Sequence, residues 1–209
     1  ANPPIGPCGP AGLGIKASSL DLAQVPSYSI PAITGEYTLI CVASVSDVFN
    51  IRSLIDADSY PSSRYMQFRV ETNSLINAIC FNSVGSAFFS YSSKAVELNI
   101  PFVSAIRLSG NSLCVALSGE IGTPVAVTGS LKTTHERFTI AGSQSSNGVD
   151  CVDGGAIVYA WIAFPYGLPD ENLIYLTKSV ENFWRIFEPE EIPLFKPIVT
   201  AQYASPVSD

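Results

Sequence analysis

The sequence predicts a single, nearly all-β domain of the sandwich or barrel class, and three observations support this. Short apolar runs separated by Gly, Pro, Ser and Asn follow one another along most of the chain, as in antiparallel sandwiches. Within 66–71 apolar and polar residues alternate strictly, a period of two that places one face of a strand in a core and the other in water. Apolar residues take a helical spacing after Pro169, near the end of the chain.

The predicted strands are short and are bounded by turn residues. They cover residues 27–30, 37–44, 53–55, 65–71, 74–82, 88–92, 102–109, 112–117, 137–140 and 156–164. Gly110 and Asn111 tolerate the positive φ that a two-residue hairpin turn requires, so the strands on either side are expected to be antiparallel neighbours. The run 156–162 barely alternates, which predicts a central strand covered on both faces.

One short helix is expected after the strands. Pro169 suits the first helical position, and Asp170 and Glu171 follow where the helix dipole favours negative charge. Leu173 and Leu176 then recur at helical spacing. A second helical turn, rich in aromatic residues, is expected to follow and to cap one end of the sandwich.

The chain divides into three predicted segments: an N-terminal arm at 1–14, a sandwich domain at 15–187 and an extended C-terminal arm at 188–209. The first segment holds four Pro and four Gly and has no hydrophobic period, which favours an arm or linker. The last segment contains four Pro, which a continuous helix or an inner strand does not accommodate.

Composition argues against two classes of partner. The 209 residues are 47% hydrophobic and 14% charged, but no stretch approaches the roughly 20 uninterrupted apolar residues that span a bilayer, so no membrane insertion is expected. The formal charge of −7 and scattered basic residues argue against nucleic acid, because phosphate binding depends on clustered Lys and Arg. The N-terminus shows no secretory-signal pattern.

The five cysteines form no CxxC pair, and a single His does not complete a zinc site of usual spacing. Cys41, Cys80 and Cys114 lie inside apolar strand patterns, where a free thiol acts as a small hydrophobic side chain. We expect reduced, buried cysteines and assembly in a reducing cytoplasm, with disulfides as the alternative.

Short motifs follow one another along 17–187. They are 19–22 (SLDL), 28–31 (YSIP), 36–40 (EYTLI), 112–119 (SLCVALSG), 138–142 (FTIAG), 154–161 (GGAIVYAW), 168–173 (LPDENL) and 182–187 (NFWRIF). In this order they resemble the concanavalin A-like or laminin G-like jelly roll, and the closing motifs resemble those of phage and prophage structural proteins. Two positions depart from the pattern: Ser118 stands where the family has Asn, and Phe183 where the phage form has Pro.

This resemblance implies an all-β, two-sheet antiparallel jelly-roll sandwich with one or two short C-terminal helices. It also implies a non-enzymatic structural component of a tailed-phage virion, such as a capsid decoration, head fibre or tail module. The implied partners are other copies of the chain, other virion proteins and a host-surface glycan, and the implied location is the virion, assembled in the host cytoplasm. A carbohydrate-binding, lectin-like module is the alternative, and a polysaccharide hydrolase is the least supported reading.

No catalytic constellation is predicted. Glycosidases of this fold need two carboxylates held close together, often as E-x-D-x-E on one strand, and no such triplet occurs. Glu188, Glu190 and Glu191 lie beside a proline in the C-terminal arm and are expected to be solvated charges. His135 lies in a polar turn and is expected to be exposed rather than a general base.

One loop and a set of tyrosines are the candidate binding residues. Asn147, Asp150 and Asp153 supply oxygen ligands in a Gly-containing loop, and members of the resembled family often bind Ca²⁺ at a rim, which makes Ca²⁺ the one candidate cofactor. The same residue types are common in any exposed turn. The candidate glycan contacts are the aromatic residues Tyr60, Tyr65, Tyr91 and Tyr166.

Overall fold

The computed structural model describes most of the predicted sandwich. Its described residues are 5–7, 13–16, 23–26, 36–59, 63–130, 137–140, 143–145, 148–150 and 155–185, with side chains described for 36–57, 66–130 and 155–185.

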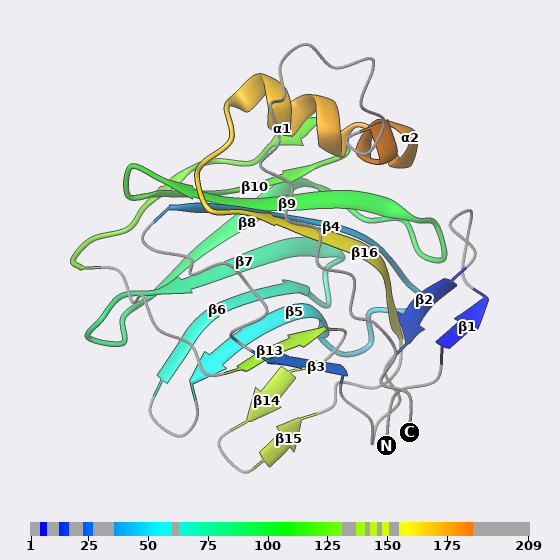
Figure 1. The fold of residues 1–209 in the computed structure, drawn as a ribbon, viewed down its shortest axis with the longest axis horizontal. Coiled ribbons are helices and arrows are strands. Elements are labelled where there is room, and N and C mark those ends of the chain that lie inside the picture. Colours follow the sequence, from blue (N-terminus) through cyan, green and yellow to red (C-terminus); the bar gives the residue numbers. More distant parts are fainter. Residues whose placement is uncertain are drawn as a thin grey trace.

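Two antiparallel sheets pack face to face, and two helices lie on the outer face of one of them (Figure 1). Sheet A consists, in spatial order, of β1 (Ile5–Pro7), β2 (Leu13–Lys16), β16 (Ala156–Phe164), β4 (Tyr37–Val45), β9 (Phe102–Ser109), β10 (Ser112–Leu117) and β11 (Glu120–Ile121), and β12 (Val125–Ala126) also pairs with β10. Sheet B consists of β3 (Ala23–Pro26), β13 (Arg137–Ile140), β5 (Arg52–Ser59), β6 (Ser63–Val70), β7 (Leu75–Phe81) and β8 (Ala87–Ala95). A separate hairpin pairs β14 (Ser143–Ser145) with β15 (Gly148–Asp150). The predicted two-sheet antiparallel sandwich is confirmed.

The core between the sheets is formed by alternate residues of each strand. Met66, Phe68 and Val70 of β6 face it, as their alternation predicts, and belong to the same buried cluster as Leu39 and Cys41 of β4. The intervening residues of β6 therefore lie on the outer face of sheet B, away from sheet A.

Helices α1 (Asp170–Thr177) and α2 (Val180–Trp184) cover the outer face of sheet A (Figure 1). Leu173, Leu176 and Phe183 are fully buried there in one cluster with Ile40 and other residues of sheet A. Both helices thus lie on a face of the sandwich, whereas the sequence led us to expect the second one, α2, at an end.

The backbone of α2 accounts for the departure from the phage motif at Phe183. The Phe183 N–H donates to the carbonyl of Ser179 at 3.2 Å, a bond that Pro cannot make. The Ser179 side chain also caps the helix, accepting from the Asn182 N–H at 3.2 Å.

Two tight hairpins use residues with positive φ. Gly110 and Asn111 have φ of 54° and 62° and join β9 to β10, which confirms the predicted hairpin. Ser118 and Gly119, with φ of 51° and 79°, join β10 to β11 in the same way. The position where the resembled family has Asn is thus one where Asn tolerates the backbone better than Ser does.

The strands extend further than the sequence indicates at several places. β5 continues to Ser59, and β1 pairs with β2, so sheet A begins before Ile15, where the sequence places the start of the domain. Pro7 is compatible with β1 because β1 is an edge strand. The expected strand at 27–30 lies outside the described residues.

Cys41, Cys80 and Cys114 are buried and free, as predicted. Burial raises the pKa of all three thiols, that of Cys80 to about 11. Cys8 and Cys151 lie outside the described residues. In the part of the chain that the structure describes, no helix is both long and apolar enough to cross a membrane.

Candidate functional site

The outer face of sheet B carries a mixed set of polar and aromatic side chains, which we call the sheet B face. The helices lie on the other side of the molecule, against sheet A (Figure 1). The described members of the sheet B face that matter here are Asp56, Gln67, Arg69, Glu71, Asn77, Ile79, Phe89 and Tyr91.

Strand register brings these residues together from segments that are distant in sequence. Gln67 lies between Asp56 of β5 and Ile79 of β7. Two residues further along β6, Arg69 lies beside Asn77 of β7, and Asn77 lies beside Tyr91 of β8. Directly opposed residues have Cβ atoms about 5 Å apart, so neighbouring side chains in these rows touch.

A chain of hydrogen bonds fixes Arg69 and Glu71. Arg69 donates from Nε to Glu71 Oε1 at 2.8 Å and from Nη1 to Gln67 Oε1 at 3.3 Å. Gln67 Nε2 donates in turn to Asp56 Oδ2 at 3.1 Å. Asn77 Nδ2 donates to Glu71 Oε1 at 2.9 Å, so the carboxylate is held from two sides. The network orients a charged donor and a charged acceptor next to each other.

Asp56, Gln67 and Asn77 are buried, and only Arg69 and Glu71 of the network are partly exposed to solvent. Within the described residues, Arg69 Nη2 and Glu71 Oε2 have no protein partner, and the two side chains are 20% and 16% exposed. The Asn77 side chain is completely buried, and its Oδ1 has no hydrogen-bonding partner. Asn77 therefore takes part in the network through its Nδ2 alone.

Two aromatic side chains border the network on β8. Phe89 and Tyr91 are 45% and 42% exposed and point to the same face, because they are two residues apart on one strand. Their spacing along the strand is about 6.6 Å. They give this part of the sheet B face an apolar surface next to Asn77 and Ile79 of β7.

The position of β8 depends on a close approach by the chain at Gly122. A Cβ on Gly122 would lie 2.0 Å from the Tyr91 carbonyl oxygen, so only glycine fits. Ser90 Oγ donates to the Thr123 carbonyl at 3.4 Å, and Lys94 pairs with Glu120 at 2.6 Å. The hydrogen bond from Lys94 lowers the pKa of the exposed Glu120 carboxyl.

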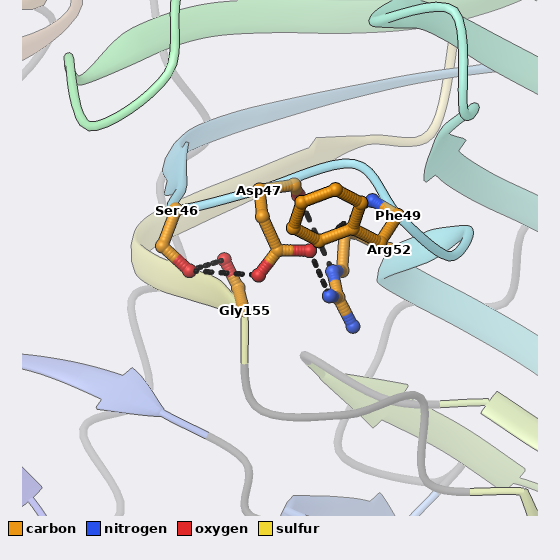
Figure 2. A network of polar contacts seen from close by, with 5 residues as sticks. All are labelled: Ser46, Asp47, Phe49, Arg52 and Gly155. Carbon is orange, nitrogen blue, oxygen red and sulfur yellow. Dashed lines mark hydrogen bonds and ion pairs between the residues drawn. The ribbon is translucent and has the colours of Figure 1, made fainter.

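A second polar cluster lies at one rim of the sandwich, where β4 ends and β16 begins (Figure 2). Arg52, whose side chain is buried, forms an ion pair with Asp47 and donates from Nε to the Asp47 carbonyl at 3.3 Å. The Phe49 N–H donates to Asp47 Oδ1 at 3.2 Å, and Ser46 Oγ donates to Asp47 Oδ2 at 3.3 Å. The hydrogen bond from Arg52 is the main reason that the pKa of Asp47 is lowered.

The contacts of this rim cluster stabilise the fold, because they join the end of β4 to the start of β16. The Ser46 N–H and hydroxyl both donate to the carbonyl of Gly155, the last residue of the predicted calcium loop. Because the guanidinium of Arg52 already neutralises Asp47, the carboxylate is not available as a ligand for a cation. The Phe49 side chain projects outward and is 89% exposed.

The candidate residues from the sequence are distributed over different parts of the molecule. Tyr91 lies on the sheet B face, whereas Tyr166 lies on the side of sheet A, where its ring contacts Phe164 at 5.8 Å and its carbonyl accepts from Thr38 Oγ1. The structure therefore does not bring Tyr91 and Tyr166 together. Tyr60 and the side chain of Tyr65 lie outside the described residues.

The predicted calcium ligands and catalytic alternatives remain predictions. Asp150 belongs to β15, but its side chain, like all of Asn147 and Asp153, is outside the described residues, as are His135 and the glutamates of the C-terminal arm. In the described ranges, no group of three or more His, Cys, Asp or Glu side chains is placed to hold a metal ion.

Arg69, Glu71, Gln67 and Asn77 were not among the sequence candidates. A signal was present for three of them, since the alternation over 66–71 that places Met66 in the core also places Gln67, Arg69 and Glu71 outward. The alternation does not predict the register of β6 with β5 and β7, or of β7 with β8, and this register brings the residues of the sheet B face together.

Comparison with known protein structures supports the two-sheet sandwich fold. No family model and no curated protein matches the sequence. The CBM40 of the Ruminococcus gnavus IT-sialidase, bound to α2,3-sialyllactose, is similar at 15% identity over 78% of this chain and 96% of that chain, with a TM-score of 0.63. Trypanosoma rangeli sialidase in complex with sialic acid is similar at 16% identity over 82% of this chain, with a TM-score of 0.61.

A heptameric SAP-like pentraxin from Limulus polyphemus is also similar, at 10% identity over 70% of each chain and a TM-score of 0.56. The chain spans 28% of the length of the Trypanosoma rangeli sialidase. At these identities the likeness defines a class of fold: the protein is a concanavalin A-like jelly-roll sandwich. None of these three structures is a phage protein, so they give the virion assignment no support.

Proposed function

We propose that the protein is a non-catalytic glycan-binding module and that the sheet B face is its binding surface. The observation that carries the proposal is that the exposed Tyr91 on β8 and the oriented Arg69–Glu71 pair lie in one row of the sheet, with Asn77 of β7 between them. The similarity to CBM40, whose structure contains sialyllactose, supports the same class of function.

The chemistry of the face fits a sugar ring. Sugars present an apolar face of C–H groups, which packs on an aromatic ring whose face is electronegative. Around the edge of the sugar, hydroxyls both donate and accept, and Arg69 and Glu71 offer a charged donor and a charged acceptor. Because Gln67 and Asn77 already hold these groups in place, binding costs little side-chain entropy.

Titration calorimetry after a screen on an oligosaccharide array tests the proposal. Replacement of Tyr91 by Ala is expected to weaken binding about tenfold through loss of the stacking surface. Tyr166→Ala is the matched control, because Tyr166 is equally exposed but lies on the side of sheet A. Equal losses in both variants, or an array without any bound glycan, would contradict the proposal.

Absence of catalysis is part of the proposal. Among the described residues of the sheet B face, Glu71 is bound by Arg69 and Asn77, and Asp56 is buried behind Gln67, so both carboxylates are engaged in positioning. Incubation with the oligosaccharides that bind is expected to release no new reducing ends. Their release at a rate abolished by Glu71→Gln would favour the hydrolase alternative.

Self-association and a role in a virion remain proposals. The sequence resemblance motivates the virion role, and the heptameric pentraxin is compatible with a homo-oligomer. Light scattering is expected to give a defined oligomer, and a monomer at all concentrations would argue against assembly. Glycan binding and virion assembly are compatible with each other, because a virion module that binds a host glycan has both.

A further inference from the structure

The charge balance of the sheet B face bears on which glycans it selects. We infer that the face selects neutral sugars that present two adjacent hydroxyls, and that it disfavours sugars whose contact is a carboxylate. This inference rests on the proposed function, since it names the class of ligand for the same surface.

Uncompensated positive charge favours the binding of a carboxylate ligand, and the described side chains of this face supply none. The only described cation on it, Arg69, is paired with Glu71 at 2.8 Å. Asp56 adds a second negative charge behind Gln67. An incoming carboxylate would meet Glu71 while approaching Arg69, and like charges at this range repel. The formal charge of −7 on the whole chain acts in the same direction.

The same pair fits a diol. One sugar hydroxyl accepts from Arg69 Nη2, and its neighbour donates to Glu71 Oε2, the two atoms that have no protein partner among the described residues. Both hydrogen bonds involve a charged group, so each is stronger than a bond between neutral partners.

Asn77 contributes by orienting the carboxylate. Its Nδ2 donates to Glu71 Oε1, and because the side chain has no exposed surface it positions Glu71 without itself contacting the sugar. Tyr91, opposite Asn77, provides the stacking surface for the same sugar.

The test measures affinities for paired oligosaccharides that differ only in a terminal acidic sugar, such as lactose and 3′-sialyllactose, with uronic acid pairs added from the array. The wild-type protein is expected to bind neutral members at least as tightly as their acidic partners, with little dependence on salt. Glu71→Gln is expected to weaken binding of neutral sugars about tenfold to a hundredfold, because a charged acceptor is lost. Glu97→Gln is the control, since Glu97 is exposed outside this face and the substitution removes the same charge.

The outcomes separate the inference from the proposed function. Preference for the acidic partners, with tighter binding of them by Glu71→Gln, would overturn the inference and leave glycan binding intact. Absence of binding to either class would overturn the proposed function, and the inference with it. Loss of neutral binding in Glu71→Gln but not in Glu97→Gln supports both.

Discussion

The close approach of Gly122 to β8 yields a prediction for both stability and binding. A Cβ at this position would lie 2.0 Å from the Tyr91 carbonyl oxygen and 3.3 Å from that of Val115. Ordinary contact begins at 3.4 Å, so Gly122→Ala must increase the separation between residue 122 and β8 by about 1.4 Å. The atoms in the way are backbone, which cannot swing aside as a flexible side chain can. Overpacking of this kind costs about 1–3 kcal/mol.

Urea unfolding followed by tryptophan fluorescence measures this cost. Gly122→Ala is expected to lower the unfolding midpoint without a change in slope, and to weaken glycan binding because Tyr91 lies on the displaced strand. Thr123→Ala, an exposed neighbour, is the control and is expected to change stability by less than about 0.5 kcal/mol. A Gly122→Ala variant as stable as the wild-type protein would show that β8 does not lie where the structure places it.

Four further predictions test other parts of the molecule. Ser118→Asn is expected to raise stability by about 0.5 kcal/mol in urea unfolding, because Asn adopts the φ of 51° with less strain. Phe183→Ala is expected to lower it by about 3–5 kcal/mol, since the ring is fully buried between α2 and sheet A. The folded pKa of Asp47 lies below its ordinary value of 3.8, so the stability contributed by its pair with Arg52 is present above pH 3.8 and is lost as the pH falls through the folded pKa. Asp47→Asn is therefore expected to lower the melting temperature at neutral pH, and this difference from the wild-type protein is expected to shrink at acidic pH. Glycan affinity is expected to persist in EDTA, because side chains of the sheet B face make the proposed contacts, and loss of affinity would point to calcium in the loop 146–155.

The sequence predicted strands best where turn residues bracket a continuous apolar run. β9, β10, β13 and β16 begin and end at the predicted residues. β5 was predicted too short, because Asp56 and Asp58 interrupt its apolar pattern although tertiary pairing continues through them. Strands β1 to β3 were missed, since Pro and Gly in this part of the chain indicate turns and only pairing with other strands makes them part of a sheet.

The candidate site was predicted only in part. Tyr91 was chosen because aromatic residues are common sugar contacts. Arg69 and Glu71 became candidates only once the structure showed that Gln67 and Asn77, at neighbouring positions of the sheet, hydrogen-bond to them. Cross-strand neighbours are set by register, and register depends on turns and bulges such as the irregularity between β7 and β8. Strand register therefore could not be predicted from the single sequence.

Titration of the isotope-labelled protein with a bound oligosaccharide, followed by NMR, tests the location of the binding surface most directly. The largest shifts are expected at the Arg69 Nε–H, at the Asn77 side-chain amide and at the backbone amides around Tyr91. Shifts concentrated instead around Asp47 and Phe49 at the rim, or on α1, with the sheet B face unchanged, would contradict the assignment of the sheet B face as the glycan-binding surface.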